Sequence, residues 1–200
     1  MNVGDGQGTA VTGGEGGKRP GGFGRTAMKY GAIAGLVVGA GLYGTTLALA
    51  GRMPHGVAGM AVGYATMLVA LSMVFVGIKR HRDLDRGGVI RFWPAFGLGL
   101  AISLVASVCY VLAWELAQAT TVSDFAGHYA EATLARARAE GMDPAGLSRL
   151  AAQMEAFKAQ YADPLFRLPM TFAEIFPVGV LVSLVSAAIL RNPRALPARG

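Results

Sequence analysis

The chain has 200 residues, of which 53% are hydrophobic and only 15% are charged, and its formal net charge is +6. Because soluble domains carry about 25% charged residues, this composition excludes an ordinary soluble domain and indicates a membrane protein. The basic residues lie between apolar stretches instead of on one polar segment, so they indicate membrane topology and argue against a nucleic-acid partner.

Residues 1–25 are rich in glycine and polar residues and offer almost no apolar surface to bury, so we predict a disordered tail. The first apolar stretch, 28–50, is long enough to cross a bilayer, which takes about 20 residues. A signal peptide is the alternative, because Arg25 and Lys29 precede the stretch and Ala-Leu-Ala at 48–50 resembles a cleavage site. The length of the apolar run and the spans that follow it favour a retained helix.

Three more apolar stretches follow, and each is long enough to be a transmembrane helix: 56–78, 94–119 and 169–190. The short connection 51–55 makes the first two spans an antiparallel hairpin. After the second span comes a strongly basic loop, 79–91. Its cations are candidates for binding anionic lipid headgroups, and a role as a topology anchor is the alternative. These candidates are Lys79, Arg80, Arg82, Arg86 and Arg91.

Residues 120–168 are polar and carry charges of both signs, so they form an insertion between the third and fourth spans. Asp143 followed by Pro144 is typical of a helix start, and apolar residues then recur at helical spacing up to Tyr161. A weaker amphipathic helix covers about 123–140. We predict a helical hairpin that is too small to form its own core and that lies against the bundle or the membrane surface.

With the N-terminus in the cytoplasm, the inner segments hold twelve Lys and Arg residues and the outer segments hold six. Basic residues mark the cytoplasmic side, so we expect both termini there. The predicted fold is all-α: a four-helix transmembrane bundle with an amphipathic helical insertion between spans 3 and 4. Its parts are a Gly-rich cytoplasmic tail (1–25), spans 1 to 3 (26–119), the extracytoplasmic insertion (120–168), span 4 (169–190) and a basic cytoplasmic tail (191–200).

Three stretches carry a resemblance to a known family: 67-MLVALSMVFVGIKRHRD-83, 87-GGVIRFWPAFGLGLAISLVASVCYVLAWE-115 and 164-PLFRLPMTFAEIFPVGVLVSLVSAAILR-191. The pieces VGIK, RD, GG, FxxAF, PLF, MTF and EIFPVG occur in this order, and together they are more specific than any one of them. Over most of residues 28–191 the chain resembles a family of bacterial integral membrane proteins known as domain of unknown function forty-one ninety-nine. The resemblance implies a four-span inner-membrane protein with an amphipathic insertion before the last span, and it implies no activity and no catalytic residues.

Two acidic residues in apolar segments, Glu115 and Glu174, are the first candidates for a functional site. At a rise of about 1.5 Å per residue, both fall near the outer face of the membrane, on separate spans. Intramembrane acids often mark proton or ion paths, so a pair of carboxylates that exchanges protons is one interpretation. The alternative is that each acid pairs with a neighbouring cation such as Arg52, His55 or Arg167, or reaches water.

The spans also contain a proline and a polar stripe. Pro177 frees a backbone carbonyl in the last span, and we favour a fixed bend there over a hinge. Four polar or aromatic residues recur at helical spacing on the third span: Ser103, Ser107, Tyr110 and Trp114. The stripe could line a polar pathway, but hydrogen bonds between helices are the simpler interpretation, with Ser183 and Ser186 as partners.

Glycines at four-residue spacing give two of the spans a smooth face that another helix can approach closely. They are Gly31, Gly35 and Gly39 in the first span and Gly59 and Gly63 in the second. We favour close helix packing at these faces over a ligand groove, and the same faces would allow two copies of the chain to associate.

No catalytic motif is present, because the three histidines are far apart and neither a nucleophile elbow nor a Walker loop occurs. The single cysteine, Cys109, can form no disulfide within the chain. We therefore expect no enzymatic activity, no metal and no cofactor. Two functions stay open: a non-catalytic structural or accessory membrane component, with another membrane protein or a second copy as partner, and a small transporter or channel that uses Glu115 and Glu174. The position of both acids away from the midplane favours the first.

Overall fold

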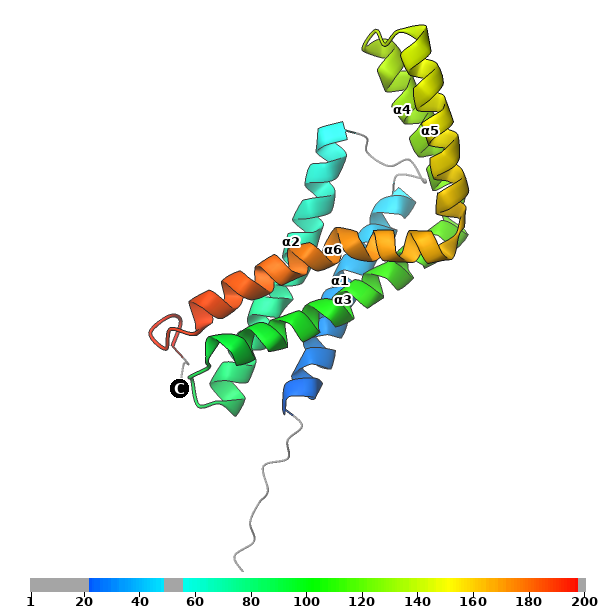
Figure 1. The fold of residues 1–200 in the computed structure, drawn as a ribbon. Helices are drawn as coiled ribbons and strands as arrows, with labels where there is room; N and C mark the ends of the chain where they lie inside the picture. The colour runs from blue at the N-terminus through cyan, green and yellow to red at the C-terminus, as the bar shows by residue number, and fades with distance from the viewer. Residues whose placement is uncertain (1–21, 49–55, 198–200) are drawn as a thin grey trace, which may run out of the picture.

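The structure is a computed structural model that describes residues 22–48 and 56–197. Over these residues the fold is all-helical, with six helices and no strand (Figure 1). The helices are α1 (Gly22–Ala48), α2 (Gly56–Asp85), α3 (Phe92–Thr120), α4 (Phe125–Ala139), α5 (Pro144–Ala162) and α6 (Pro164–Leu190). Residues 1–21 of the predicted tail lie outside the described part, and α1 begins at Gly22, inside the tail that we expected to end at residue 25.

Helices α1, α2, α3 and α6 pack against one another: α1 contacts α2 and α3, and α6 contacts α2 and α3. Their shared core is aliphatic and includes the fully buried side chains of Leu71, Val74, Leu98, Ile102 and Ile175. Helices α4 and α5 pack against each other, and α5 contacts α6. In Figure 1 the α4–α5 hairpin projects from the end of α3 and α6, away from the other helices.

Three helical segments are long and apolar enough to cross a membrane: Gly63–Asp85, Phe92–Thr120 and Pro164–Leu190. They correspond to the second, third and fourth predicted spans. The first predicted span, α1, is not among these segments, and the side chains of residues 46–48 at its end lie outside the described part. By length and composition alone, the described residues thus contain three spans where the sequence led us to expect four.

Two helix boundaries differ from the prediction. The basic segment from Lys79 onward is helical and belongs to α2, and the chain reverses only at Gly87 and Gly88, whose φ angles are 63° and 87°. Helix α6 begins at Pro164, earlier than the predicted start at residue 169. Both differences have one cause: apolar sequence marks the part of a helix inside the hydrocarbon layer, and a helix can continue beyond that layer into the polar zone.

The insertion folds as a helical hairpin, and it does not lie along the bundle, which was one of the two expected positions. Helix α5 begins at the predicted signal, where Asp143 Oδ1 accepts a hydrogen bond from Gly146 N at 3.2 Å and Pro144 occupies the first turn. Rings of the two helices pack together, with the Tyr129 and Phe157 centroids 5.7 Å apart. The hairpin meets the other helices at its base and does not lie along them (Figure 1). Contact of the hairpin with the membrane surface stays a prediction.

The glycines of α1 pack against α3. A Cβ added at any of the three would lie within 3.1 Å of the facing side chain. The facing pairs are Gly31 with Val105, Gly35 with Cys109, and Gly39 with Ala113. In contrast, no atom lies within 4 Å of a Cβ built on Gly63, so the second glycine face makes no such contact there. Gly59 lies outside the part of α2 whose side-chain surroundings are described.

Candidate functional site

A cluster of polar and aromatic side chains lies where α3, α5 and α6 meet, at the base of the hairpin. We call it the junction cluster, and its members are Tyr110, Trp114 and Glu115 of α3, Tyr161 of α5, and Arg167 and Glu174 of α6. Tyr110 and Trp114 are four positions apart and Arg167 and Glu174 are seven apart, so each pair shares one face of its helix, and Glu115 follows Trp114 directly. Both acids singled out from the sequence therefore belong to one cluster.

Glu115 forms a two-point ion pair with Arg167, whose Nε donates to Oε1 at 2.7 Å and whose Nη2 donates to Oε2 at 2.6 Å. The pair is sheltered, with 29% of the Glu115 side chain and 16% of the Arg167 side chain exposed. Arg167 Nη1 also donates to the backbone oxygen of Tyr161 at 3.2 Å. Of the three cations predicted as partners, Arg167 is thus the one that meets Glu115, while Arg52 and His55 lie outside the described residues.

Trp114 and Tyr161 attach the hairpin to α3. The Trp114 Nε1–H donates to Tyr161 Oη at 2.8 Å, and both side chains are buried. Phe125, at the start of α4, packs edge-on against Trp114 with the ring centroids 5.1 Å apart. Burial raises the pKa of Tyr161 above its ordinary value, so its hydroxyl stays neutral. Sequence reasoning placed Trp114 in the polar stripe of the third span and Tyr161 at the end of an apolar helical series, and it missed their contact.

Glu174 lies on the exposed side of α6. The hydroxyl of Tyr110, which is buried, donates to Glu174 Oε2 over a long 3.4 Å. Among the described residues no cation pairs with Glu174. The two acids therefore face different partners, Arg167 for Glu115 and a hydroxyl for Glu174, and the described structure does not join them as a carboxylate pair.

The serine stripe of α3 is closed against α6. Ser103 Oγ donates to the backbone oxygen of Gly179 at 3.1 Å and lies 3.1 Å from Ser183 Oγ. Ser107, which we expected to bond to another helix, donates instead to the Ser103 backbone oxygen of its own helix at 2.8 Å. These serines and Ser186 are buried, so the stripe lies in the contact between the helices.

Gly99 and Gly179, two glycines that sequence reasoning did not single out, make the α3–α6 crossing close. A Cβ on Gly99 would lie 2.8 Å from Ser183 Cβ, and a Cβ on Gly179 would lie 2.7 Å from Ser103 Cβ. Each helix thus sets a serine against a glycine of the other helix. The signal for this contact is present in the sequence, because each glycine is four residues from a serine, as in small-xxx-small motifs.

The basic segment 79–91, which we expected to contact lipid headgroups, contains buried or paired cations and exposed ones. Arg82 is fully buried and therefore cannot bind a headgroup, which corrects the prediction for this residue. Lys79 is partly buried and pairs with Asp83 at 2.6 Å. The exposed residues of this segment, which stay accessible to headgroups, are Arg80, Arg86 and Arg91.

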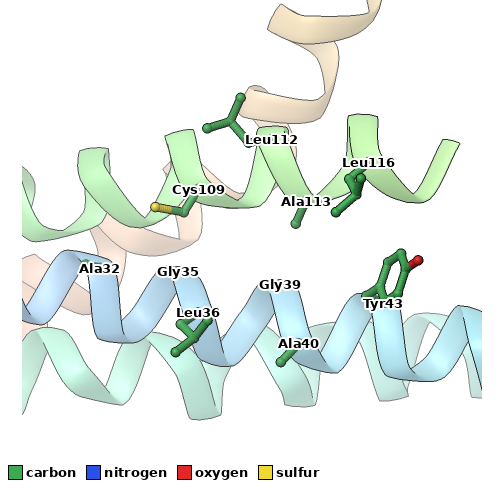
Figure 2. Close-up of a pocket in the computed structure, with 10 residues that line it drawn as sticks. All are labelled: Ala32, Gly35, Leu36, Gly39, Ala40, Tyr43, Cys109, Leu112, Ala113 and Leu116. Carbon is green, nitrogen blue, oxygen red and sulfur yellow. The ribbon is translucent and has the colours of Figure 1, made fainter. Parts of the chain in front are cut away.

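An open apolar groove of about 420 Å³ runs between α1 and α3 (Figure 2). Gly35 and Gly39 line it from α1, and Cys109, Leu112 and Leu116 line it from α3. Figure 2 shows the thiol of Cys109 as the lone sulfur in this lining. The lining is almost wholly apolar, so the groove offers no set of groups for acid–base chemistry.

The last helix continues through both of its prolines, Pro169 and Pro177, without interruption. Ile175 and Gly179, on either side of Pro177, are buried against the neighbouring helices. Packing on both sides of a proline can offset the hydrogen bond that the proline removes. Pro177 therefore does not divide the last helix into two elements.

A family model described as "Protein of unknown function (DUF4199)" matches residues 29–192, from the first apolar stretch to the end of the last. The family resemblance carried by the sequence motifs is thereby confirmed. No curated protein and no solved structure matches the chain.

Proposed function

The chain belongs to the DUF4199 family of proteins of unknown function, and on this premise we propose that it is an integral protein of a bacterial inner membrane with a non-catalytic, structural or accessory role. In this proposal α1, α2, α3 and α6 all cross the bilayer, and both termini lie in the cytoplasm. The α4–α5 hairpin lies on the opposite side.

The contacts at the two ends of α1 support its assignment as the fourth span. Gly22 lies beside Asp85 and His81, at the C-terminal end of α2. Near the other end of α1, the Tyr43 hydroxyl lies 3.2 Å from Thr120 Oγ1, at the C-terminal end of α3. Because a short turn joins α2 to α3, these contacts are at opposite ends of the molecule. Helix α1 therefore runs along the length of α3. If α3 crosses the bilayer, α1 crosses it as well.

The close packing of α3 against α6 is the main observation in favour of a structural role. A path from Glu174 toward the cytoplasm along the serine stripe would pass between α3 and α6, where Gly179 meets Ser103 and Gly99 meets Ser183. Both serines are fully buried. The other acid, Glu115, is neutralised by Arg167. Residues that carry protons through a membrane need access to water on both sides, and this packing disfavours such access.

A small transporter or channel is the second candidate, and the exposed carboxylate of Glu174 is the observation that favours it. Two measurements separate the candidates. Purification from native membranes is expected to retain a membrane-protein partner, or a second copy, at fixed stoichiometry. An association of two copies would use a surface other than Gly31 and Gly35, because α3 covers these.

In the second measurement the protein is reconstituted into vesicles that contain a pH-sensitive dye. Wild type and Glu174→Gln are expected to show the same background proton leak. A flux carried by wild type and abolished by Glu174→Gln would overturn the structural role and establish the transporter. A protein that purifies as a monomer without any partner would contradict the accessory role.

A further inference from the structure

Three segments that are far apart in the chain meet at one end of the molecule: the start of α1, the end of α2 and the segment after α6 (Figure 1). A Cβ on Gly22 of α1 would lie 3.4 Å from Asp85 Oδ2 and 3.5 Å from His81 Cε1. The segment after α6 is in contact with Arg82. We call this region the basic end.

Arg82 holds the C-terminal segment against α2. Its Nη1 donates to the backbone oxygen of Ala195 at 2.9 Å and its Nη2 to that of Leu196 at 2.5 Å. Nη1 also lies 3.5 Å from the backbone oxygen of Leu190, and Nε donates to Asp83 at 2.8 Å. The Arg82 guanidinium is fully buried and therefore does not contact lipid. Its hydrogen bonds to backbone oxygens fix the position of the C-terminal segment beside α2.

The acids of α2 at this end are already paired. Asp83 accepts from Lys79 at 2.6 Å as well as from Arg82, and Asp85 Oδ2 lies 2.8 Å from His81 Nδ1. The cations around them are exposed, and none forms an ion pair within the part of the chain that the structure describes. These cations are Arg25 and Lys29 of α1, Arg80 of α2, Arg86 and Arg91 of the segment between α2 and α3, and Arg191 and Arg194 of the C-terminal segment.

Exposed apolar side chains are interleaved with these cations. Trp93 is 74% exposed, Leu84 is 73% exposed and Val89 is 57% exposed. A surface that combines arginines with tryptophan and aliphatic side chains matches the headgroup zone of a bilayer, where phosphates and acyl chains are both within reach. This combination favours a lipid over a soluble anion.

We propose that the basic end is a composite binding surface for the phosphates of anionic lipids, and that Arg82 is its positioning residue. Arg80 and Arg86, at the end of α2 and just after it, act as one surface with the C-terminal Arg191 and Arg194, because Arg82 holds Ala195 and Leu196 beside α2. This inference rests on the proposed membrane location, and it adds the class of lipid and the part played by the C-terminal segment.

The test measures binding of phosphatidylglycerol to the full-length protein, purified in a zwitterionic detergent, by native mass spectrometry. Phosphatidylcholine is the reference lipid. Arg191→Gln/Arg194→Gln is expected to weaken binding of phosphatidylglycerol about 30-fold, which corresponds to about 1 kcal/mol per arginine. The control is Arg138→Gln/Arg149→Gln in the hairpin, which removes two exposed arginines and is expected to leave the affinity unchanged.

Arg82→Gln tests the positioning role, because it is expected to lower the affinity as much as the C-terminal double variant although Arg82 itself is buried. Where Arg82→Gln does not fold, Arg82→Lys keeps the charge without the planar fork, and it is expected to give the same loss. Unchanged affinity of a folded Arg82 variant, or of the C-terminal double variant, would overturn the proposal. So would equal affinity of wild type for both lipids. The assay is independent of which side of the membrane the basic end faces, so an incorrect topology would not produce either result.

Discussion

Glu115 and Glu174 are both glutamates in long apolar helices, but their surroundings differ. Glu115 meets a guanidinium through two hydrogen bonds, whereas Glu174 meets one hydroxyl at 3.4 Å. Removing one partner of a sheltered ion pair leaves the other charge without compensation, and this cost exceeds the net benefit of the pair itself. The two residues should therefore respond differently to the same substitution.

Glu115→Gln is expected to lower the free energy of unfolding by about 1–3 kcal/mol, because it leaves Arg167 without a counter-charge. Chemical denaturation in detergent measures the change. Glu140→Gln is the matched control, since its pair with Arg136 is exposed and should contribute little. The double variant Glu115→Gln/Arg167→Gln should recover part of the loss. Equal effects of Glu115→Gln and Glu140→Gln would contradict the assigned role of the pair.

Single residues also show where sequence reasoning reaches its limit. The pair of Glu115 with Arg167, one of three candidate partners, could be predicted, because spacing along the spans places both residues near the same end of the bundle. The burial of Arg82 could have been predicted only from its position on the helix. Arg82 follows Ile78 by four residues and Ile78 follows Leu71 by seven, so all three lie on the same buried face. Its acceptor on Ala195 lies 113 residues further along the chain, and no local pattern identifies such a contact.

Between elements, the α3–α6 contact depends on the missing side chains of Gly99 and Gly179. The facing residues are Ser103 and Ser183, whose Cβ atoms belong to the helix wall and cannot move away as the end of a long side chain could. Any added carbon must therefore separate the two helices or distort them. Packed interiors resist both changes.

Gly179→Ala is expected to lower the free energy of unfolding by about 1–3 kcal/mol, because the new Cβ would lie 2.7 Å from Ser103 Cβ. Gly97→Ala in α3 is the control, since nothing lies within 4 Å of its Cβ position. That control should be neutral or stabilising by up to about 1 kcal/mol, because alanine favours helix more than glycine does. Thermal unfolding of both variants in the same detergent measures the difference, and a neutral Gly179→Ala would mean that the helices cross elsewhere.

The hairpin shows which features of an element its sequence can predict. Asp143 and Pro144 indicate the start of α5 correctly because capping is a local interaction. The direction in which the hairpin points depends on Trp114 and Tyr161, which are 47 residues apart. We therefore predicted the helices of the insertion but not its projection from the bundle.

Trp114→Phe is expected to loosen the base of the hairpin, because it keeps an aromatic ring but removes the donor to Tyr161. Amides of α4 and α5 should exchange with solvent about 3- to 10-fold faster, while those of α2 should not change. Tyr129→Phe is the control, since it removes an exposed hydroxyl and keeps the ring contact with Phe157. Exchange that is unchanged in Trp114→Phe would show that the hairpin is held by other contacts.

For the whole molecule, composition identifies three spans and connectivity supports the fourth. Helix α1 is not one of the three segments, yet its ends contact residues at opposite ends of α2 and α3. Its glycines let it lie close to α3. Contacts along a helix can therefore support a membrane span that length and composition leave open.

The proposed topology places the basic end and the hairpin on opposite sides of the membrane, and cysteine labelling tests it. In a Cys109→Ser background, which removes the single native cysteine, Ser148→Cys reports on α5 and Val89→Cys reports on the α2–α3 turn. Both positions are exposed. In intact spheroplasts an impermeant maleimide is expected to label Ser148→Cys, and it should reach Val89→Cys only after the membrane is opened. Cys109→Ser alone should stay unlabelled throughout. Labelling of both reporters from the same side would refute the arrangement, because α3 would then not cross the bilayer, and α1, which runs along it from end to end, would not cross either.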